Sequence, residues 1–304
     1  MTQPRPVALL LTGKPTMEGA GVRLNRVFGH PEVPRFDPFL LLDDFGSDNP
    51  DDYLAGFPWH PHRGIETVTY MLSGEVEHED SLGNEGVIGA GDVQWMTAGG
   101  GIIHQEMPRR IDERLRGLQL WVNLPAASKM MEPRYRDVSA DTIPEVSPHD
   151  GLRIKVIAGE VVGVRGPVQD VVADPEYLDI TLEPGADLEH PTPPGHTVFA
   201  YGVDGRGKVG PNGIHELGRG QLALFAAGDS VVAKADSLQL RFLLVSGRRL
   251  GDPVAWSGGL GMKARVGVAA ACRGWRGGSV VSGGEWGSAG PGFGVVGCGA
   301  VGVG

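Results

Sequence analysis

Three histidines and a glutamate occur as two pairs with the same spacing, His60 with His62 and His104 with Glu106. Side chains two apart on a β-strand point to the same face, so each pair can direct both groups to one side. The pairs are about forty residues apart and are joined by an alternating apolar stretch, so two neighbouring strands would bring all four groups to one point. We interpret this point as the active site.

Three imidazoles and one carboxylate suit a single mononuclear non-haem metal and leave open positions on a six-coordinate ion for O₂ and a chelating substrate. Fe(II) is the leading candidate, and Mn, Ni, Co or Cu could fill the same ligand set. We expect His60, His62, His104 and Glu106 to be the ligands. Glu66 lies nearby in the sequence, and we expect it to hydrogen-bond a ligand histidine rather than to touch the metal.

The remaining histidines and the tryptophans give weaker signals. His190 and His196 are six apart with prolines between them, so we expect no second metal site there. Trp121 lies in an apolar run and is expected to pack in the core, as is Trp95. Four further histidines in turn-like or acidic contexts are expected to be solvated: His30, His78, His149 and His215.

The elements that must position the four groups are strands. The chain has 49 glycines and 23 prolines, which separate short segments rich in Val, Ile, Leu and Thr, as is typical of an all-β protein with many tight turns. Segments 67–72 and 75–80, joined by a Ser-Gly turn, indicate a hairpin. Segments 152–160, 177–182, 197–202 and 239–245 repeat the pattern after a Pro-rich acidic linker at 141–150, which favours an internal duplication.

We therefore expect two domains, 1–140 with the metal site and 151–256 without one. Residues 266–304 are rich in Gly, Ala, Val and Ser and show no amphipathic period, so we expect a poorly ordered tail.

Composition excludes several classes of function. The formal net charge is −10, which argues against direct nucleic-acid binding, since that depends on Lys and Arg neutralising phosphates. The two cysteines, Cys272 and Cys298, lie far out in the chain, so a disulfide framework or a Cys-based zinc site is not expected for its body. No apolar run reaches the roughly 18 residues of a membrane span, and no convincing secretory signal begins the chain. We expect a cytoplasmic monomer.

The sequence resembles the pirin family of bicupins. The resemblance covers roughly residues 10 to 265 and rests on these segments: Phe39-Leu40-Leu41-Leu42-Asp43-Asp44-Phe45-Gly46, Gly56-Phe57-Pro58 with His60-Pro61-His62-Arg63-Gly64, Glu66-Thr67-Val68-Thr69-Tyr70, Gly91-Asp92-Val93-Gln94-Trp95-Met96-Thr97-Ala98-Gly99, Gly117-Leu118-Gln119-Leu120-Trp121-Val122-Asn123-Leu124, Val156-Ile157-Ala158-Gly159-Glu160 and Gly163-Val164-Arg165-Gly166-Pro167.

The resemblance implies two tandem cupin barrels (double-stranded β-helix, or jelly-roll) with one metal, usually iron, in the N-terminal barrel and none in the second. The family's ligand pattern falls on His60, His62, His104 and Glu106. Several pirins resemble quercetin 2,3-dioxygenases, which open a flavonol ring with O₂ and release carbon monoxide, while others act as cofactors of transcription factors or regulators of metabolic enzymes.

Two functions follow as expectations. The first is flavonol ring opening, with Glu106 either staying on the metal or leaving it to accept the substrate proton. The second is a redox-sensing cofactor that binds a transcription factor or a metabolic enzyme. Pirins end in a charged amphipathic helix, which this chain lacks after Arg265; our interpretation is a reading-frame change near that residue.

Overall fold

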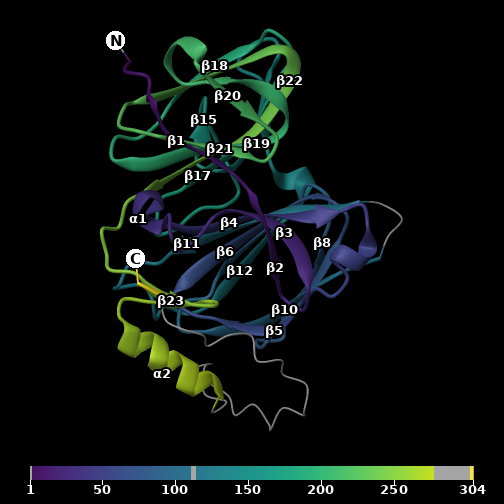
Figure 1. The fold of residues 1–304 in the computed structure, drawn as a ribbon, viewed down its shortest axis with the longest axis vertical. Coiled ribbons are helices and arrows are strands. Elements are labelled where there is room, and N and C mark those ends of the chain that lie inside the picture. The colour runs from purple at the N-terminus through teal and green to yellow at the C-terminus, as the bar shows by residue number, and fades with distance from the viewer. Residues whose placement is uncertain (1, 111–113, 277–301, 304) are drawn as a thin grey trace. The chain divides into compact units, whose positions relative to one another are not determined.

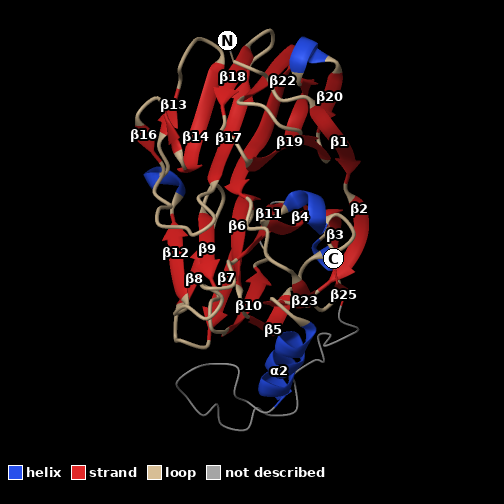
Figure 2. Cartoon of the chain, turned by 90° about the vertical axis from the view of Figure 1, so that its left-hand side faces the viewer, coloured by secondary structure: helices blue, strands red, loops and turns tan. Residues whose placement is uncertain are grey.

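Several strands form where buried and exposed side chains alternate, because successive residues of a strand face opposite sides of the sheet, whereas others, such as residues 93–97, are buried on both faces. In β7 (Val76–Asp80), for example, the first, third and fifth side chains are buried and the two glutamates between them are exposed. A computed structural model describes residues 2–110, 114–276 and 302–303 of this chain. All described strand pairs of the named sheets are antiparallel, and strands account for most of the structure (Figure 2).

The chain divides into two units that are not contiguous in sequence. The first unit contains residues 15–35, 39–140 and 251–304, and the second contains residues 1–14, 36–38 and 141–250. These ranges differ from the expected domains at both ends of the chain. The strand β1 (Val7–Thr12) pairs with β21 (Gln221–Phe225) of the second unit, and the segment from residue 251 onward belongs to the first unit.

The first unit is built on two sheets, drawn mainly in purple and blue in Figure 1. Its larger sheet has seven strands, in the order β12 (Arg134–Val138), β9 (Val93–Thr97), β6 (Ile65–Ser73), β11 (Leu115–Asn123), β4 (Phe39–Ser47), β3 (Val22–Phe28) and β2 (Lys14–Glu18). Its smaller sheet has four, in the order β5 (Phe57–His62), β10 (Ile102–Pro108), β7 and β8 (Glu85–Ile88). A further small sheet joins β24 (Leu260–Met262), β23 (Ala255–Ser257) and β25 (Gly302–Val303).

The second unit has one nine-stranded sheet. Along its path lie β1, β21, β19 (His196–Val209), β22 (Ser230–Arg248), β17 (Glu176–Leu182), β14 (Leu152–Ala158) and β13 (Glu145–Val146), while β18 (Asp187–Pro191) pairs with β22 and β20 (His215–Gly218) pairs with β19. A separate hairpin joins β15 (Glu160–Val161) and β16 (Val164–Arg165). The expected linker at 141–150 contributes the short strand β13, which pairs with β14.

Apolar side chains form a large buried cluster in the second unit. Its members include Leu178, Ile180, Val198, Phe242 and Leu244, all fully buried. Burying such side chains is worth about 1.5–3 kcal/mol each before the cost of ordering the chain. Among the described residues of the first unit, buried side chains form further clusters, such as the one that contains Val22, Phe45 and Met71.

In the part of the chain that the structure describes, the helices are α1 (Val33–Phe36), α2 (Arg265–Arg276) and the short 3₁₀ turns η1 (Pro50–Asp52), η2 (Ala140–Thr142) and η3 (Pro211–Gly213). Among the described residues, no helix is both long and apolar enough to cross a lipid bilayer.

The expectation of a poorly ordered tail after Arg265 is wrong for residues 266–276, which form α2 (Figure 1). Ala269, Ala270 and Ala271 favour a helix locally. Val268 and Ala271, three apart on one face, are fully buried, and the helix packs on β23 and β24. Residues 277–301 and 304, the rest of the expected tail apart from β25, lie outside the described residues.

Candidate metal centre

The two sequence pairs lie on adjacent strands, as their spacing predicts. His60 and His62 end β5, and His104 and Glu106 lie in β10. The strands pair antiparallel with His104 directly opposite His60 and Ile102 opposite His62, and the register shifts between His104 and Glu106. Direct opposition brings side chains to within about 5.5 Å at Cβ, so one strand pair is sufficient to assemble the cluster.

The three histidines converge on one point. The Nε2 atoms of His60 and His104 are 3.0 Å apart, and one ligand atom of each of the three rings lies within 4.8 Å of the other two. The ring centroids are 4.4 to 5.0 Å apart. His62 and His104 are buried and His60 is half-buried, so one side of the cluster is accessible.

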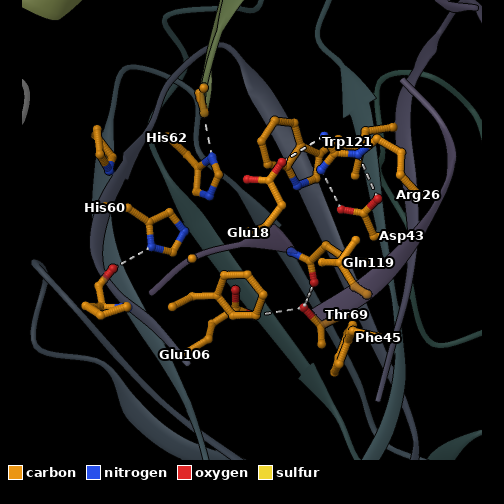
Figure 3. Close-up of a pocket in the computed structure, with 18 of the residues that line it drawn as sticks. Glu18, Arg26, Asp43, Phe45, His60, His62, Thr69, Glu106, Gln119 and Trp121 are labelled. Atoms are coloured by element: carbon orange, nitrogen blue, oxygen red, sulfur yellow. Dashed lines mark hydrogen bonds and ion pairs between the residues drawn. The ribbon is translucent and has the colours of Figure 1, made fainter. Parts of the chain in front are cut away.

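Hydrogen bonds behind the rings fix which nitrogens face the centre. Nδ1 of His60 lies 2.9 Å from the Pro58 carbonyl oxygen, and Nδ1 of His62 lies 3.3 Å from that of Gly259 (Figure 3). A carbonyl oxygen only accepts, so both Nδ1 atoms carry the proton and both Nε2 atoms keep a lone pair. Nδ1 of His104 lies 3.4 Å from the Tyr135 hydroxyl.

Burial keeps these rings neutral, since desolvation lowers the pKa of His60 and lowers the pKa values of His62 and His104 well below the usual range. Neutral imidazoles whose other nitrogen is tied to a carbonyl are the usual form of metal-bound histidine. Two lone pairs 3.0 Å apart repel unless a cation or a proton lies between them. The donor set therefore fits a metal ion.

Glu106 lies at the edge of this cluster. Its Oε2 is 4.0 Å from Nε2 of His104, and its Oε1 accepts a hydrogen bond from the Thr69 hydroxyl over 3.1 Å. Thr69 Oγ1 is also 2.6 Å from Oε1 of Gln119. Burial raises the pKa of Glu106 to about 7, while the Thr69 hydrogen bond acts in the opposite direction. Glu106 is therefore close enough to join the set and is able to exchange a proton near neutral pH.

Glu66 does not take the position that the sequence suggested. Its Oε1 accepts from the Thr97 hydroxyl over 2.6 Å, and within the described part of the chain no hydrogen bond joins it to a histidine. The reason is strand alternation on β6: Thr69 faces the cavity, and Glu66, an odd number of residues away, faces the other side. The expectation that Glu66 orients a metal ligand is wrong.

The cluster opens into a cavity of about 350 Å³ within the first unit (Figure 3), a size in the usual range for small-molecule sites. Its apolar lining includes Leu24, Leu41, Phe45, Phe57, Val76, Trp121, Trp256 and Leu260, and its polar lining includes Glu18, Arg26, Asp43, Thr69, Glu106 and Gln119. An apolar cavity with a few polar groups on its walls suits a small aromatic ligand that carries hydroxyl or carbonyl groups.

Two side chains lie elsewhere than the sequence predicted. Trp121 lines the cavity, with its ring 5.2 Å from that of His62 and 5.7 Å from that of Trp256, rather than packing solely in the core. His78, expected to be solvated, is 4% exposed and stacks on Tyr135. Trp95 is fully buried, as predicted.

The histidines of the second unit make separate contacts. Nε2 of His190 is 2.9 Å from Oε1 of Glu176, and Nδ1 of His196 is 3.5 Å from the Ser246 hydroxyl. Within the described residues, His60, His62 and His104 of the first unit form the group of three or more side chains that could together hold a metal ion.

Two cupin-type domains, one of them with three converging imidazoles, define the chain as a bicupin. More narrowly, it belongs to the pirin family: residues 21–122 match the family described as Pirin, and residues 177–281 match the Pirin C-terminal cupin domain.

Relatives support the same assignment. A "Pirin-like protein" from Caulobacter vibrioides is 44% identical over 265 residues, 87% of this chain and 95% of its own. A "Putative quercetin 2,3-dioxygenase" from Pseudomonas aeruginosa is 42% identical over 282 residues, 91% of this chain and 99% of its own. The crystal structure of a quercetin 2,3-dioxygenase from Acinetobacter baumannii matches with a TM-score of 0.83 at 29% identity, covering 91% of this chain and 98% of that one.

Proposed function

We propose that this protein is a metal-dependent quercetin 2,3-dioxygenase, which opens the central ring of a flavonol with O₂ and releases carbon monoxide. The observation that carries the proposal is the convergence of three neutral imidazoles, of which His60 and His62 line a 350 Å³ cavity. The name of the Pseudomonas relative and the likeness to the Acinetobacter enzyme support the same reaction.

His60, His62 and His104, with Glu106, would hold one divalent transition metal, for which Fe(II) is our first choice and Mn, Ni, Co and Cu the alternatives. Such a metal supplies Lewis acidity toward the enolic hydroxyl of the flavonol and open coordination positions. The hydrogen bonds from His60 and His62 to backbone carbonyls keep both rings oriented, so binding requires little rearrangement.

Glu106 is the group that we assign to proton transfer. Burial raises its pKa to about 7 before a metal is bound. A bound cation would lower that pKa, so the carboxylate is ionised and can accept a proton at neutral pH. Its carboxylate would accept the proton of the flavonol hydroxyl, and the Thr69 hydroxyl, 3.1 Å away, orients the carboxylate for that step. Positioned bases of this kind contribute about 10²–10⁴-fold to rate.

Of the two ring systems, Trp121 and Trp256, one would contact the face of a planar substrate and the other its edge. Both line the cavity, and their rings are perpendicular to within about 12°, at an interplanar angle of 78°. Apolar walls also exclude water, which strengthens the electrostatic interactions inside the site.

The test is turnover of quercetin by the metal-loaded protein, followed as O₂ uptake together with carbon monoxide release. We expect both from the wild type and neither from His104→Gln. Glu106→Gln keeps the three histidines, so it should still load with excess metal, although more weakly, and should lose at least about a hundredfold in kcat. A metal-loaded wild type that behaves like His104→Gln would exclude the dioxygenase function. The binding of a transcription factor or metabolic enzyme would then be the function to pursue.

A further inference from the structure

A group of charged side chains forms part of the cavity wall on the larger sheet. Glu18, Arg26 and Asp43 come from β2, β3 and β4 and line the same cavity as His60 and His62, which come from the smaller sheet. Figure 3 shows the three side chains together near Trp121, apart from His60. They are not metal ligands, and the reaction proposed above assigns them no role.

Arg26 is held rigidly by its carboxylate neighbours. Its Nε and Nη2 donate to the two oxygens of Asp43 over 2.9 and 2.8 Å, and its Nη1 lies 2.8 Å from Oε1 of Glu18. A two-point pairing of this kind fixes both the position and the plane of the guanidinium. Both carboxylate oxygens of Asp43 therefore accept hydrogen bonds from Arg26, and the fixed guanidinium in turn holds the carboxylate of Glu18 in place.

Glu18 keeps one oxygen for another partner. Within the described residues, its ion pair with Arg26 uses Oε1, and no hydrogen bond to its Oε2 is present. In Figure 3 this second oxygen points away from Arg26, toward the side where His62 is drawn. The side chain is 39% exposed, so a ligand in the cavity can reach it.

The charge balance of the group decides what kind of ligand it takes. Two carboxylates and one guanidinium leave a formal charge of −1, so an anionic group is repelled and a hydrogen-bond donor is attracted. The neighbouring lining residues Leu24 and Phe45 are apolar. A hydroxyl group on an aromatic ring satisfies both requirements.

We propose that Glu18 is a specificity-determining residue, which accepts a hydrogen bond from a hydroxyl on a flavonol ring other than the ring that reacts. The inference rests on the proposed function for the identity of the ligand. Arg26 and Asp43 act as positioning residues that hold the Glu18 carboxylate in place. The contact selects flavonols that bear additional hydroxyl groups and disfavours ligands with a carboxylate at that position.

The experiment compares quercetin with 3-hydroxyflavone, which keeps the reactive hydroxyl and carbonyl but has no other hydroxyl group. Glu18→Gln is measured by anaerobic quenching of tryptophan fluorescence in the metal-loaded protein, which gives Kd without turnover, and by aerobic kinetics. Losing a hydrogen bond to a charged acceptor should weaken quercetin binding about tenfold and leave 3-hydroxyflavone within about twofold. KM for quercetin should rise with it, and kcat should stay unchanged.

Glu75→Gln is the matched control, because Glu75 is also 39% exposed and also paired with an arginine, Arg109, at 3.1 Å, but does not line the cavity. This variant should leave the Kd values of both quercetin and 3-hydroxyflavone unchanged. Equal Kd values for wild type and Glu18→Gln with quercetin, or equal losses for both ligands, would overturn the inference.

The outcomes separate the two proposals. If the wild type turns over quercetin and Glu18→Gln binds it normally, the inference fails and the dioxygenase function stands. If the wild type shows no turnover but Glu18→Gln binds quercetin about tenfold more weakly, the dioxygenase function fails and the recognition role of Glu18 stands.

Discussion

Nδ1 of His62 donates to the carbonyl oxygen of Gly259 over 3.3 Å, so the orientation of one candidate ligand depends on a residue 197 positions later in the chain. The same carbonyl accepts from the backbone N–H of Arg63 over 3.1 Å, and the N–H of Gly261 donates to the Arg63 carbonyl over 2.8 Å. The segment after residue 251 therefore contributes to the candidate metal centre, because it fixes the tautomer and the plane of an imidazole.

Gly259→Ala should weaken metal binding. A Cβ at this position would lie 2.4 Å from Nδ1 of His62 and 2.3 Å from the carbonyl oxygen of Pro61, so the imidazole or the backbone must move. Disturbing a partner behind a ligand typically costs about 10–100-fold in metal affinity. The affinity is measured by competition with a chelator. Gly89→Ala, where a Cβ would meet only Asp92 Oδ2 at 3.4 Å, is the control and should bind normally; an unchanged Gly259→Ala would contradict the prediction.

Metal removal should lower the melting temperature of the wild type, because a ligand that binds only the folded state stabilises it by about 4 kcal/mol at a thousandfold excess over Kd. His104→Gln should lose this dependence on added metal. Without metal, the variant should lose little stability, since it removes one of the two nitrogens that lie 3.0 Å apart. Scanning calorimetry with and without anaerobic Fe(II) measures both effects. His149→Gln, a change at an exposed histidine of the second unit, should keep the full metal response.

The histidine cluster was predictable because the signal within each pair is local. Two i, i+2 pairs specify faces of strands, so the groups meet once β5 pairs with β10, although His60 and His104 are 44 residues apart. Glu66 was misplaced although the same rule applies: on β6 it lies three residues from Thr69 and so must face the other side.

The cavity wall carried a signal that the sequence reading missed. Polar residues alternate with apolar ones inside otherwise hydrophobic strands, at Asp43 in β4, Thr69 in β6 and Gln119 in β11, and all three line the cavity. Trp121 is two residues from Gln119 and shares its face, so it belongs with them rather than with the core.

Long-range contacts could not be read from the sequence. The carbonyl of Gly259 orients His62 only because two chain segments far apart in sequence come close together. A glycine in the sequence does not by itself predict such a contact. Helix α2 was missed although its signal is local. Its alanine run favours a helix, but the glycine-rich composition of residues 266 to 304 taken together concealed that run.

Thr69→Val should shift the pH profile of turnover. The Thr69 hydroxyl donates to Glu106 and so favours its ionised form, opposing the burial that raises the pKa of Glu106. Without the hydroxyl that pKa rises further, so the acid limb of the kcat profile should move up by about one pH unit. Thr97→Val removes the same kind of bond, from Thr97 to the buried Glu66, and serves as the control. A shift in Thr97→Val as large as that in Thr69→Val would show a general structural effect and refute the specific one.

The buried Lys129 should make the free energy of unfolding depend on pH, and its environment determines whether that free energy rises or falls. Its Nζ donates to the carbonyl oxygens of Gly64 and Gly261 over 2.9 and 3.1 Å and to Oδ1 of Asn123 over 2.6 Å, and the side chain is 2% exposed. Burial lowers its pKa from 10.5 to about 8. Between these two values the unfolded chain holds the proton and the folded protein releases it, so the unfolded state binds more protons and stability rises with pH.

The measurement is the free energy of unfolding of wild type minus that of Lys129→Met, from urea titrations between about pH 7.5 and about pH 10.5. Methionine keeps the length of the side chain and does not titrate, so the difference isolates the lysine. The difference should be flat below about pH 8 and then rise by about 2–3 kcal/mol, since one pKa unit corresponds to about 1.4 kcal/mol. A difference that stays constant or falls over this range would mean that the three oxygen acceptors, rather than burial, control the protonation of Lys129 in the folded protein.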